Sequence, residues 1–353
     1  MVFRNLRGYF TNKWVLVNPF LVWRTVKGFW RALFGRNTLR NIEIFPSMKC
    51  NLKCRMCSIE KFNDEPGEPL MQKDYERLAN EAAALGCASV TILGGEPLLV
   101  QDLKEIIRIF HRRHYYVHMV SNATTITRKK LEELKNVGLN GICISLDSLD
   151  EKENDAIRGL PGHYMKAMDS INIAKELGLV VSLAPVFFPG RLEEGIKVVE
   201  FCQSHGIGAS GSQVSPVGGW EGQQILSKKE NDRIRQLIKK FPRMTMDWGM
   251  SYFLKCRCPA GKEKVAISTN GNVFGCSINP ISFGNIKHEE LRKILKRMQS
   301  FSKLNIDSSV CLAGEDADYV ERFLRPLEKF DHYPVAWTEH PALTQEREPN
   351  LHR

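Results

Sequence analysis

Short β-rich runs alternate with helical patterns through residues 41–215, and this alternation leaves the chain few possible folds. The expected strands lie at 42–45, 89–93, 116–120, 141–145, 179–184 and 209–215. Helical patterns separate them, at 72–85, 102–113, 127–137, 163–177 and 191–204. A helix between consecutive strands implies right-handed crossovers and a parallel sheet. Since these units are too few for a closed eight-stranded barrel, we predict an α/β chain folded as an open (β/α)6 partial barrel.

Three cysteines follow the first expected strand, at the strand end where such folds carry their chemistry. Cys50, Cys54 and Cys57 are four and three residues apart on one short loop. Thiolates are soft ligands, and three of them can hold three irons of a four-iron, four-sulfur cluster while the fourth iron stays open. A disulfide with one additional thiol, or a zinc site lacking a ligand, is the alternative interpretation.

The spacing of these cysteines resembles the signature of the radical S-adenosylmethionine (SAM) superfamily, with Met56 where the family usually has an aromatic residue. The resemblance implies a partial TIM barrel whose open iron chelates the amino and carboxylate groups of SAM. One electron, supplied through a donor such as flavodoxin or ferredoxin, then cleaves the sulfonium. The resulting 5′-deoxyadenosyl radical abstracts hydrogen from the substrate.

A glycine-containing segment, Gly94-Gly95-Glu96-Pro97, follows the second expected strand. Glycine lets the backbone approach a ligand closely, and the Glu96 carboxylate can accept a hydrogen bond from an ammonium. By itself Gly-Gly is often a turn. At a strand end about forty residues after the cysteines, the tetrapeptide resembles the family's motif for binding the methionine amino group.

Further polar residues stand at the ends of later strands. By position, the resemblance implies contacts with the SAM ribose or the substrate from Ser121, Asn122, Ser145 and Asp147. Turn and cap roles explain Ser, Asn and Asp equally well. Arg158, just ahead of a helix, resembles the family's arginine that helps to hold the SAM carboxylate, a partner for which a guanidinium is well shaped. A surface ion pair is the alternative for this residue.

A second cysteine group follows a helical stretch near 227–240. A Cys-x-x-Gly segment, the hairpin signal Asn270-Gly271-Asn272 and a cysteine on the exit strand resemble the auxiliary-cluster extension called SPASM, or its shortened form, Twitch. The resemblance implies one auxiliary 4Fe-4S cluster, with the ligands Cys256, Cys258, Cys276 and Cys311. Structural zinc fits four cysteines equally well. The remaining cysteines, which we interpret as packing residues, are Cys87, Cys143 and Cys202.

The N-terminal arm holds most of the chain's formal net charge of +10. No acidic residue precedes Glu43, whereas basic residues stand at positions 4, 7, 13, 24, 27, 31, 36 and 40. Asn18 and Pro19 predict a helix start and Gly35 a stop. Its apolar residues form one arc with Arg24, Lys27 and Arg31 beside it, which is the pattern of a helix lying in an anionic membrane interface. Docking on the protein's own body is the alternative.

We therefore expect four parts: a basic amphipathic arm (1–40), a radical SAM partial barrel (41–225), a small cysteine-rich domain of β-hairpin and helix (226–315), and a C-terminal helix and tail (316–353). Cysteines clustered in metal-type spacings predict a reducing, cytoplasmic compartment. The amphipathic helix adds the expectation of peripheral attachment at the inner face of a membrane.

The residues indicate how a radical is made but leave its substrate open. If the arm binds a membrane, a lipid or lipid-linked glycan is favoured. The alternative is a peptide or protein maturase that cross-links, epimerises or dehydrogenates, although the arm is short for the separate peptide-recognition domain that such enzymes often have. A metal-containing nucleic-acid-binding protein is a third class, disfavoured because large apolar residues interrupt the basic arm.

Overall fold

One mixed sheet organises the chain, whose computed structural model describes residues 18–34, 38–62, 65–246, 252, 257–301 and 308–345. The sheet order is β12-β11-β10-β9-β1-β2-β3-β4-β5-β7-β6, with β8 paired to β7. The barrel strands are β1 (Asn41–Ile44), β2 (Ser89–Ile92), β3 (Tyr116–Ser121), β4 (Gly141–Ile144), β5 (Val180–Leu183), β6 (Val186–Phe187), β7 (Gly208–Gln213) and β8 (Met244–Met246). Each of β1 to β5 and β7 runs parallel to the next in this order. The predicted partial barrel is confirmed.

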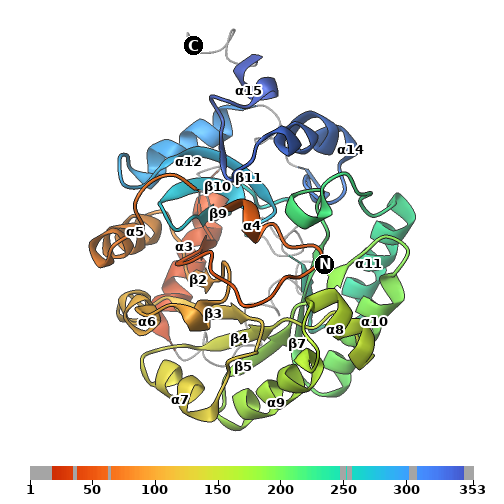
Figure 1. Cartoon of the computed structure of the whole chain (residues 1–353). Helices are drawn as coiled ribbons and strands as arrows, with labels where there is room; N and C mark the ends of the chain where they lie inside the picture. Colours follow the sequence, from red (N-terminus) through yellow and green to blue (C-terminus); the bar gives the residue numbers. More distant parts are fainter. Residues whose placement is uncertain are drawn as a thin grey trace.

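Helices surround the curved sheet, as Figure 1 shows. They are α5 (Gln72–Ala84), α6 (Leu103–Arg112), α7 (Arg128–Asn136), α8 (Glu151–Arg158), α9 (His163–Glu176), α10 (Leu192–Ser204) and α11 (Lys228–Lys240). The sequence patterns did not predict α8 as a separate helix. Asp150 caps it by accepting a hydrogen bond from the Glu153 N–H, and Gly159 ends it at φ +69°.

The two faces of the sheet differ because side chains alternate along each strand. Val90, Ile92, Val117 and Met119 are fully buried in the main core. The side chains of the opposite face are mostly polar, and those of β2 and β3 are only partly buried. There Asn41 Oδ1 accepts hydrogen bonds from the hydroxyls of Ser89, at 2.8 Å, and Thr91, at 3.3 Å.

The second cysteine group belongs to an extension of the same sheet. Its strands are β9 (Lys264–Ile267), β10 (Asn272–Cys276), β11 (Asn279–Asn285) and β12 (Val335–Ala336). The β9–β10 hairpin is antiparallel, as its turn signal predicts, and β9 pairs in parallel with β1. A buried ion pair of 2.8 Å joins Lys264 Nζ to Glu43 Oε1 across these two strands. The hairpin therefore continues the barrel sheet at the otherwise open edge of β1.

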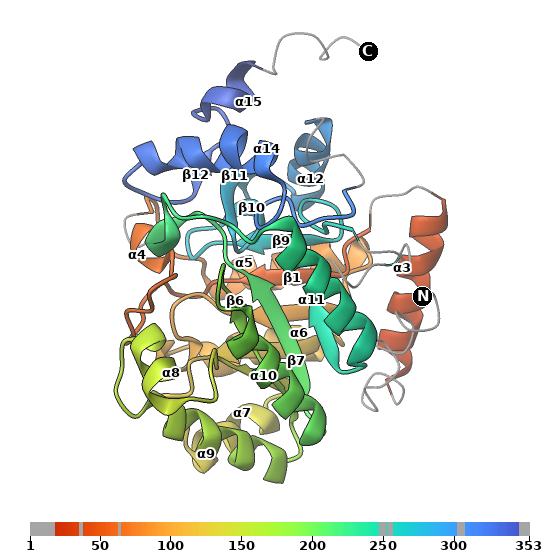
Figure 2. The same ribbon diagram turned by 90° about the vertical axis from the view of Figure 1, so that its right-hand side faces the viewer.

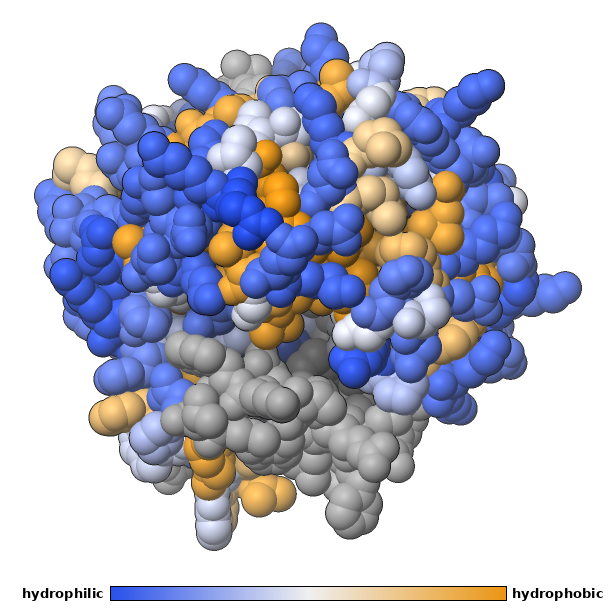
Figure 3. All heavy atoms as spheres, turned by 90° about the horizontal axis from the view of Figure 1, so that it is seen from below, coloured by the Kyte–Doolittle hydropathy of each residue, from blue (hydrophilic) through white to orange (hydrophobic). Residues whose placement is uncertain are grey.

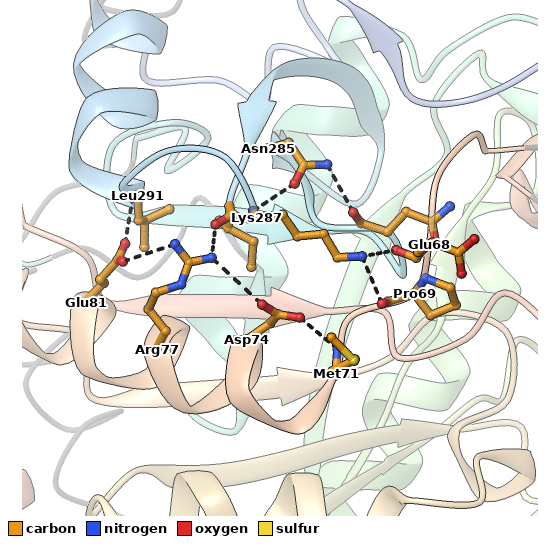
Figure 4. A network of polar contacts seen from close by, with 11 residues as sticks. Glu68, Pro69, Met71, Asp74, Arg77, Glu81, Asn285, Lys287 and Leu291 are labelled. Carbon is orange, nitrogen blue, oxygen red and sulfur yellow. Dashed lines mark hydrogen bonds and ion pairs between the residues drawn. The ribbon is translucent and has the colours of Figure 1, made fainter.

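Polar contacts also fasten this extension to helix α5, as Figure 4 shows. Glu81 Oε2 accepts a hydrogen bond of 2.7 Å from the Leu291 N–H, at the start of α12 (Leu291–Ser300). Lys287 Nζ donates to the Pro69 carbonyl at 3.0 Å. The chain then forms α14 (Ala317–Tyr319), two further helical turns, η4 (Val320–Leu324) and η5 (Arg325–Lys329), and α15 (Pro341–Gln345).

The N-terminal helix α3 (Pro19–Leu33) begins as predicted, with the Asn18 side chain accepting from the N–H groups of Phe20 and Leu21. Gly35, the predicted stop, lies outside the described residues. Figure 2 shows α3 at the end of the barrel where the strands begin, opposite α4 (Ile59–Phe62) and the cysteine loop. Among the described residues, no helix has the length and apolar character needed to cross a membrane.

Candidate active site

The loop that carries the first three cysteines lies at the carboxyl end of β1, and the Gly-Gly segment after β2 holds it in place. The Gly95 N–H donates to the Ser47 carbonyl at 3.0 Å, and the Glu96 N–H donates to the Lys49 carbonyl at 2.9 Å. A Cβ at Gly95 would lie 2.6 Å from the Met48 oxygen and closer still to the Lys49 oxygen. The sequence predicts that these glycines let the backbone approach a ligand. The structure shows that they let it approach the cysteine loop.

The three thiols are near one another and only partly exposed. Cys50 Sγ accepts hydrogen bonds from the Leu52 N–H at 3.4 Å and from Asn122 Nδ2 at 3.7 Å. Arg158 Nη1 lies 4.0 Å from Cys54 Sγ. Burial raises the pKa of Cys54 and raises the pKa of Cys57 to about 11, so these thiols need bound positive charge to ionise.

These donors suit an iron–sulfur cluster. Three soft ligands stand on one loop, and polar hydrogens and a guanidinium point at two of their sulfurs. Among the described residues, no three His, Cys, Asp or Glu side chains are grouped so that they could hold a single metal ion. A cluster of several irons is larger and accepts ligands set further apart.

Glu96 is buried, and its carboxylate connects the ends of β2 and β3. Oε1 accepts from the Ser121 hydroxyl at 2.9 Å, and Oε2 accepts from the Asn122 N–H at 2.7 Å. Oε1 also accepts from the Leu98 N–H at 3.1 Å, in the turn that Pro97 begins. A carboxylate offers about four acceptor positions, so these bonds leave about one for a ligand. Desolvation raises the pKa of Glu96, and the three hydrogen bonds oppose that rise.

The end of β4 carries a buried ion pair. Asp147 Oδ2 lies 2.7 Å from Arg158 Nε, and both side chains are almost fully buried. Asp147 Oδ1 accepts from the Val186 N–H at 2.9 Å. Arg158 does form an ion pair, but the pair is buried, so the alternative of a surface ion pair is wrong. Ser145, also buried, donates its N–H to the Ser121 carbonyl at 3.0 Å.

A supporting network behind Asp147 was missed from the sequence. Asn154 Oδ1 accepts from the Asp147 N–H at 3.2 Å, and Asn154 Nδ2 contacts His163 Nδ1 at 2.9 Å. Burial lowers the pKa of His163 to about 4, and the charge of Arg158 adds to this shift. His163 is therefore neutral near pH 7. A histidine among ordinary helical residues gives no signal of this in the sequence.

A cavity of about 360 Å³ opens beside the cysteine loop. Its lining includes Cys54, Cys57, Lys61, Gly218 and Gly219. The Gly219 N–H donates to the Cys57 carbonyl at 2.9 Å, so the Pro/Gly-rich loop after β7 packs directly on the cysteine loop. The Pro/Gly-rich composition of this loop predicts a position at the barrel mouth. No residue in it indicates from the sequence that the loop contacts the cysteine loop.

The second group of cysteines also comes together. Burial raises the pKa of Cys311, and the neighbouring Cys258 and Cys276 raise it further. Burial raises the pKa of Cys276 to about 12. The Tyr319 hydroxyl stands beside these thiols and accepts from Asn279 Nδ2 at 2.7 Å. Cys256, the fourth expected ligand, lies outside the described residues.

The three cysteines interpreted as packing residues, Cys87, Cys143 and Cys202, are fully or almost fully buried. Cys87 and Cys202 belong to the main apolar core, and Cys143 lies on β4. None of the three is placed with either cysteine group. Their packing role agrees with these positions.

Two family models match the chain. Residues 44–202 match the radical SAM superfamily, and residues 256–313 match the SPASM model, an iron–sulfur cluster-binding domain.

Similar proteins include two enzymes and one solved structure. An AdoMet-dependent heme synthase of Methanosarcina barkeri is 24% identical over 286 residues, which are 72% of this chain and 81% of that protein. A PqqA peptide cyclase of Granulibacter bethesdensis is 28% identical over 277 residues, which are 72% of this chain and 73% of that protein. The structure of Streptococcus suis SuiB bound to its precursor peptide SuiA superposes with a TM-score of 0.58 at 23% identity, and the match covers 76% of this chain and 68% of that one.

Proposed function

The chain belongs to the radical SAM superfamily and is an enzyme with a SPASM-type iron–sulfur domain, and we propose that it modifies a precursor peptide. Its cofactors are SAM, a 4Fe-4S cluster and auxiliary iron–sulfur. When bound, SAM and its cluster supply a one-electron cleavage of the sulfonium and thereby a 5′-deoxyadenosyl radical. The observation that supports a peptide is the peptide cyclase among the similar proteins, and the cysteine loop with its cavity lies at the carboxyl ends of the strands, away from α3.

In this proposal the first cysteine loop holds the catalytic cluster, through Cys50, Cys54 and Cys57. Arg158 balances the negative charge at Cys54, which it approaches to 4.0 Å. The SAM contacts proposed for the strand ends keep the set taken from the sequence: Gly94, Gly95, Glu96, Pro97, Ser121, Asn122, Ser145, Asp147 and Arg158. For Glu96, Asp147 and Arg158, the internal bonds described above mean that they also fix the shape of the site.

The auxiliary site is proposed to bind one 4Fe-4S cluster through Cys258, Cys276 and Cys311, with Cys256 as a further ligand. A protein such as flavodoxin or ferredoxin is proposed as the electron donor. The proposed place of work is the cytoplasmic face of a membrane, because the exposed apolar face of α3 suits a bilayer better than water.

Two considerations favour a peptide over a lipid. A peptide cyclase and a peptide-bound enzyme are among the similar proteins. The amphipathic arm was the observation that favoured a lipid, and α3 lies at the end of the barrel remote from the cavity. A lipid held against α3 would therefore not reach the site where the radical forms. Because one relative is a heme synthase, a small molecule is the competing substrate class that the experiment must distinguish from a peptide.

The substrate class can be identified by following the hydrogen atom that the radical takes from the substrate into 5′-deoxyadenosine. Cells that lack this enzyme are grown in deuterated medium, and their peptide, lipid and small-molecule fractions are each added to the enzyme with dithionite and unlabelled SAM. We expect deuterium in the 5′-deoxyadenosine only with the peptide fraction, because the radical takes hydrogen from its substrate. Deuterium arising only from the lipid or the small-molecule fraction would overturn the peptide proposal.

Cysteine variants test the two cluster sites separately. The Cys54→Ala variant should yield no 5′-deoxyadenosine, because the loop then lacks one of its three ligands. The triple alanine variant of Cys50, Cys54 and Cys57 should still bind iron at the auxiliary site. Zinc without iron in the triple variant would contradict the auxiliary 4Fe-4S cluster.

A further inference from the structure

Helix α3 exposes a continuous apolar face. The described part of the chain has ten exposed large apolar side chains, and six of them lie on α3 or at its C-cap. These six are Phe20, Trp23, Val26, Trp30, Leu33 and Phe34, with exposed fractions from 45% to 79%. Figure 3 shows apolar side chains projecting at the lower edge of the molecule, away from the largely hydrophilic surface above them. A patch of this kind marks an interaction surface.

The opposite face of α3 is packed on the protein, which fixes the outward direction of the apolar arc. Leu21, Thr25, Gly28 and Ala32 are buried. A Cβ at Gly28 would lie 2.5 Å from the Tyr252 ring, so only glycine allows this close approach. The helix cannot roll to bury its tryptophans, because a larger side chain would then have to occupy the place of Gly28. Helix α3 therefore docks on the protein's own body, as the alternative interpretation expected, and keeps six large apolar side chains exposed.

Contacts at the N-terminal half of α3 place it over the beginnings of the strands. Phe20 stacks on the His114 ring at 4.0 Å, and Arg24 Nη1 donates to the His114 carbonyl at 3.4 Å. Arg24 also lies 4.8 Å above the Tyr115 ring, one residue before β3 begins. The cysteine loop, by contrast, follows the carboxyl end of β1. Figure 2 shows α3 and the cysteine loop at opposite ends of the barrel, and the cavity lies beside that loop.

The charge around this face is positive. Lys27 and Arg31 stand beside the apolar arc, and no acidic residue precedes Glu43 in the sequence. Parallel topology brings the C-terminal ends of the barrel helices to the same end of the molecule, and several of them finish in basic residues that favour the helix dipole. Such residues include Arg112, the last residue of α6, Arg113, which follows it, and Lys239 and Lys240 in α11. The surface thus combines apolar side chains with a positive surround.

We propose that this face docks on an anionic lipid bilayer and holds the enzyme with its catalytic mouth turned away from the membrane. Trp23 and Trp30 would lie at headgroup depth, with Lys27 and Arg31 among the anionic headgroups. The proposal rests on the membrane location proposed above and is independent of the substrate. It brings the enzyme to the membrane while leaving the cavity open to a substrate from solution. A second copy of the chain suits this face less well, since two basic surfaces would then face each other.

Vesicle binding tests the docking surface. Wild-type protein should co-sediment with vesicles of phosphatidylcholine and phosphatidylglycerol and bind vesicles of phosphatidylcholine alone more weakly. The Lys27→Ala/Arg31→Ala variant should lose about 25-fold in affinity, at about fivefold per cation removed. The Trp23→Glu/Trp30→Glu variant should not bind. Met165→Glu, on an equally exposed residue of α9, should bind as wild type does.

The same variants separate the proposal from its competitors. SAM cleavage in solution should be unchanged in the tryptophan variant, which shows that its fold and active site are intact. Equal vesicle binding by wild type and the tryptophan variant would overturn the proposal. A wild-type dimer by light scattering that the tryptophan variant abolishes, without vesicle binding, would also overturn it and identify a second copy as the occupant. Failure of the peptide assay would leave all these readouts unaffected.

Tryptophan quenching tests the orientation. Trp220 lies at the mouth, next to Gly219, which donates to the Cys57 carbonyl. The chain has six tryptophans, so both variants are made in a Trp14→Phe/Trp248→Phe/Trp337→Phe background. Vesicles of brominated lipid should quench fluorescence in the Trp220→Phe variant, which keeps the two tryptophans of α3. Quenching should fall sharply in Trp23→Phe/Trp30→Phe, which keeps Trp220. The reverse result would place the mouth against the bilayer and overturn the proposed orientation.

Discussion

The packing of the Gly-Gly segment on the cysteine loop makes Gly95→Ala a direct test of how the site is built. Ordinary van der Waals contact of a Cβ begins near 3.4 Å, and the new Cβ would lie 2.6 Å from the Met48 oxygen. The loop would have to retreat by the difference, about 0.8 Å, and by more at Lys49. The two backbone hydrogen bonds of Gly95 and Glu96 to the loop would weaken together, at about 1 kcal/mol each.

The expected consequence is a slow enzyme that keeps its fold. A misplacement of about 1 Å at a reacting centre lowers the rate about 100-fold, so 5′-deoxyadenosine formation should fall by about that factor. The assay is single-turnover SAM cleavage by reconstituted protein, normalised to bound iron. Gly206→Ala is the matched control. It introduces alanine at φ +69° with no atom within 4 Å, in the turn between α10 and β7, and should leave cleavage unchanged. Wild-type cleavage by Gly95→Ala would refute the packing argument.

Three further outcomes follow from buried groups. Arg158→Met should destabilise the protein by about 3–5 kcal/mol in urea unfolding, because Asp147 is left buried and unpaired, and Asp147→Asn/Arg158→Met should recover most of this loss. His163 stays neutral in the folded state down to about pH 4, while an unfolded histidine takes a proton below about pH 6.5, so stability falls as pH decreases through this window. At about pH 5.5 the low pKa of folded His163 lowers the free energy of unfolding by about 1.4 kcal/mol. The His163→Gln variant should therefore lose less stability than wild type between neutral and acid pH. An equal loss in both proteins would contradict the low pKa of His163. Cys276→Ala should lose about half of the bound iron yet still cleave SAM without substrate, and unchanged iron content would exclude Cys276 as a ligand.

Much of the fold could be predicted because local patterns and connectivity dictate it. The six main barrel strands occur within a few residues of the expected positions, since β-rich runs between amphipathic helices have few other arrangements. The hairpin before Cys276 was visible in its Asn-Gly turn, and the start of α3 in Asn18 and Pro19.

The partners of individual polar side chains could not be predicted, because they depend on residues far apart in the sequence. Asp147 and Arg158 were both expected to face SAM or the substrate, and the structure pairs them with each other. The Gly-Gly segment indicated a close approach of the backbone to another group, but it did not indicate that this group is the backbone of the cysteine loop. The union of β9 with β1 joins residues more than two hundred positions apart, and no local pattern reports such a pairing.

The sequence by itself determined the chemistry that this protein can perform, because cysteine spacing on a single loop is a local property. It also determined that α3 would be amphipathic and basic, since composition and periodicity are local as well. Only the tertiary structure decided which way that helix faces. The close contact of Gly28 with Tyr252 turns its apolar arc outward, and the parallel strands place the arc and the cysteine loop at opposite ends of the barrel.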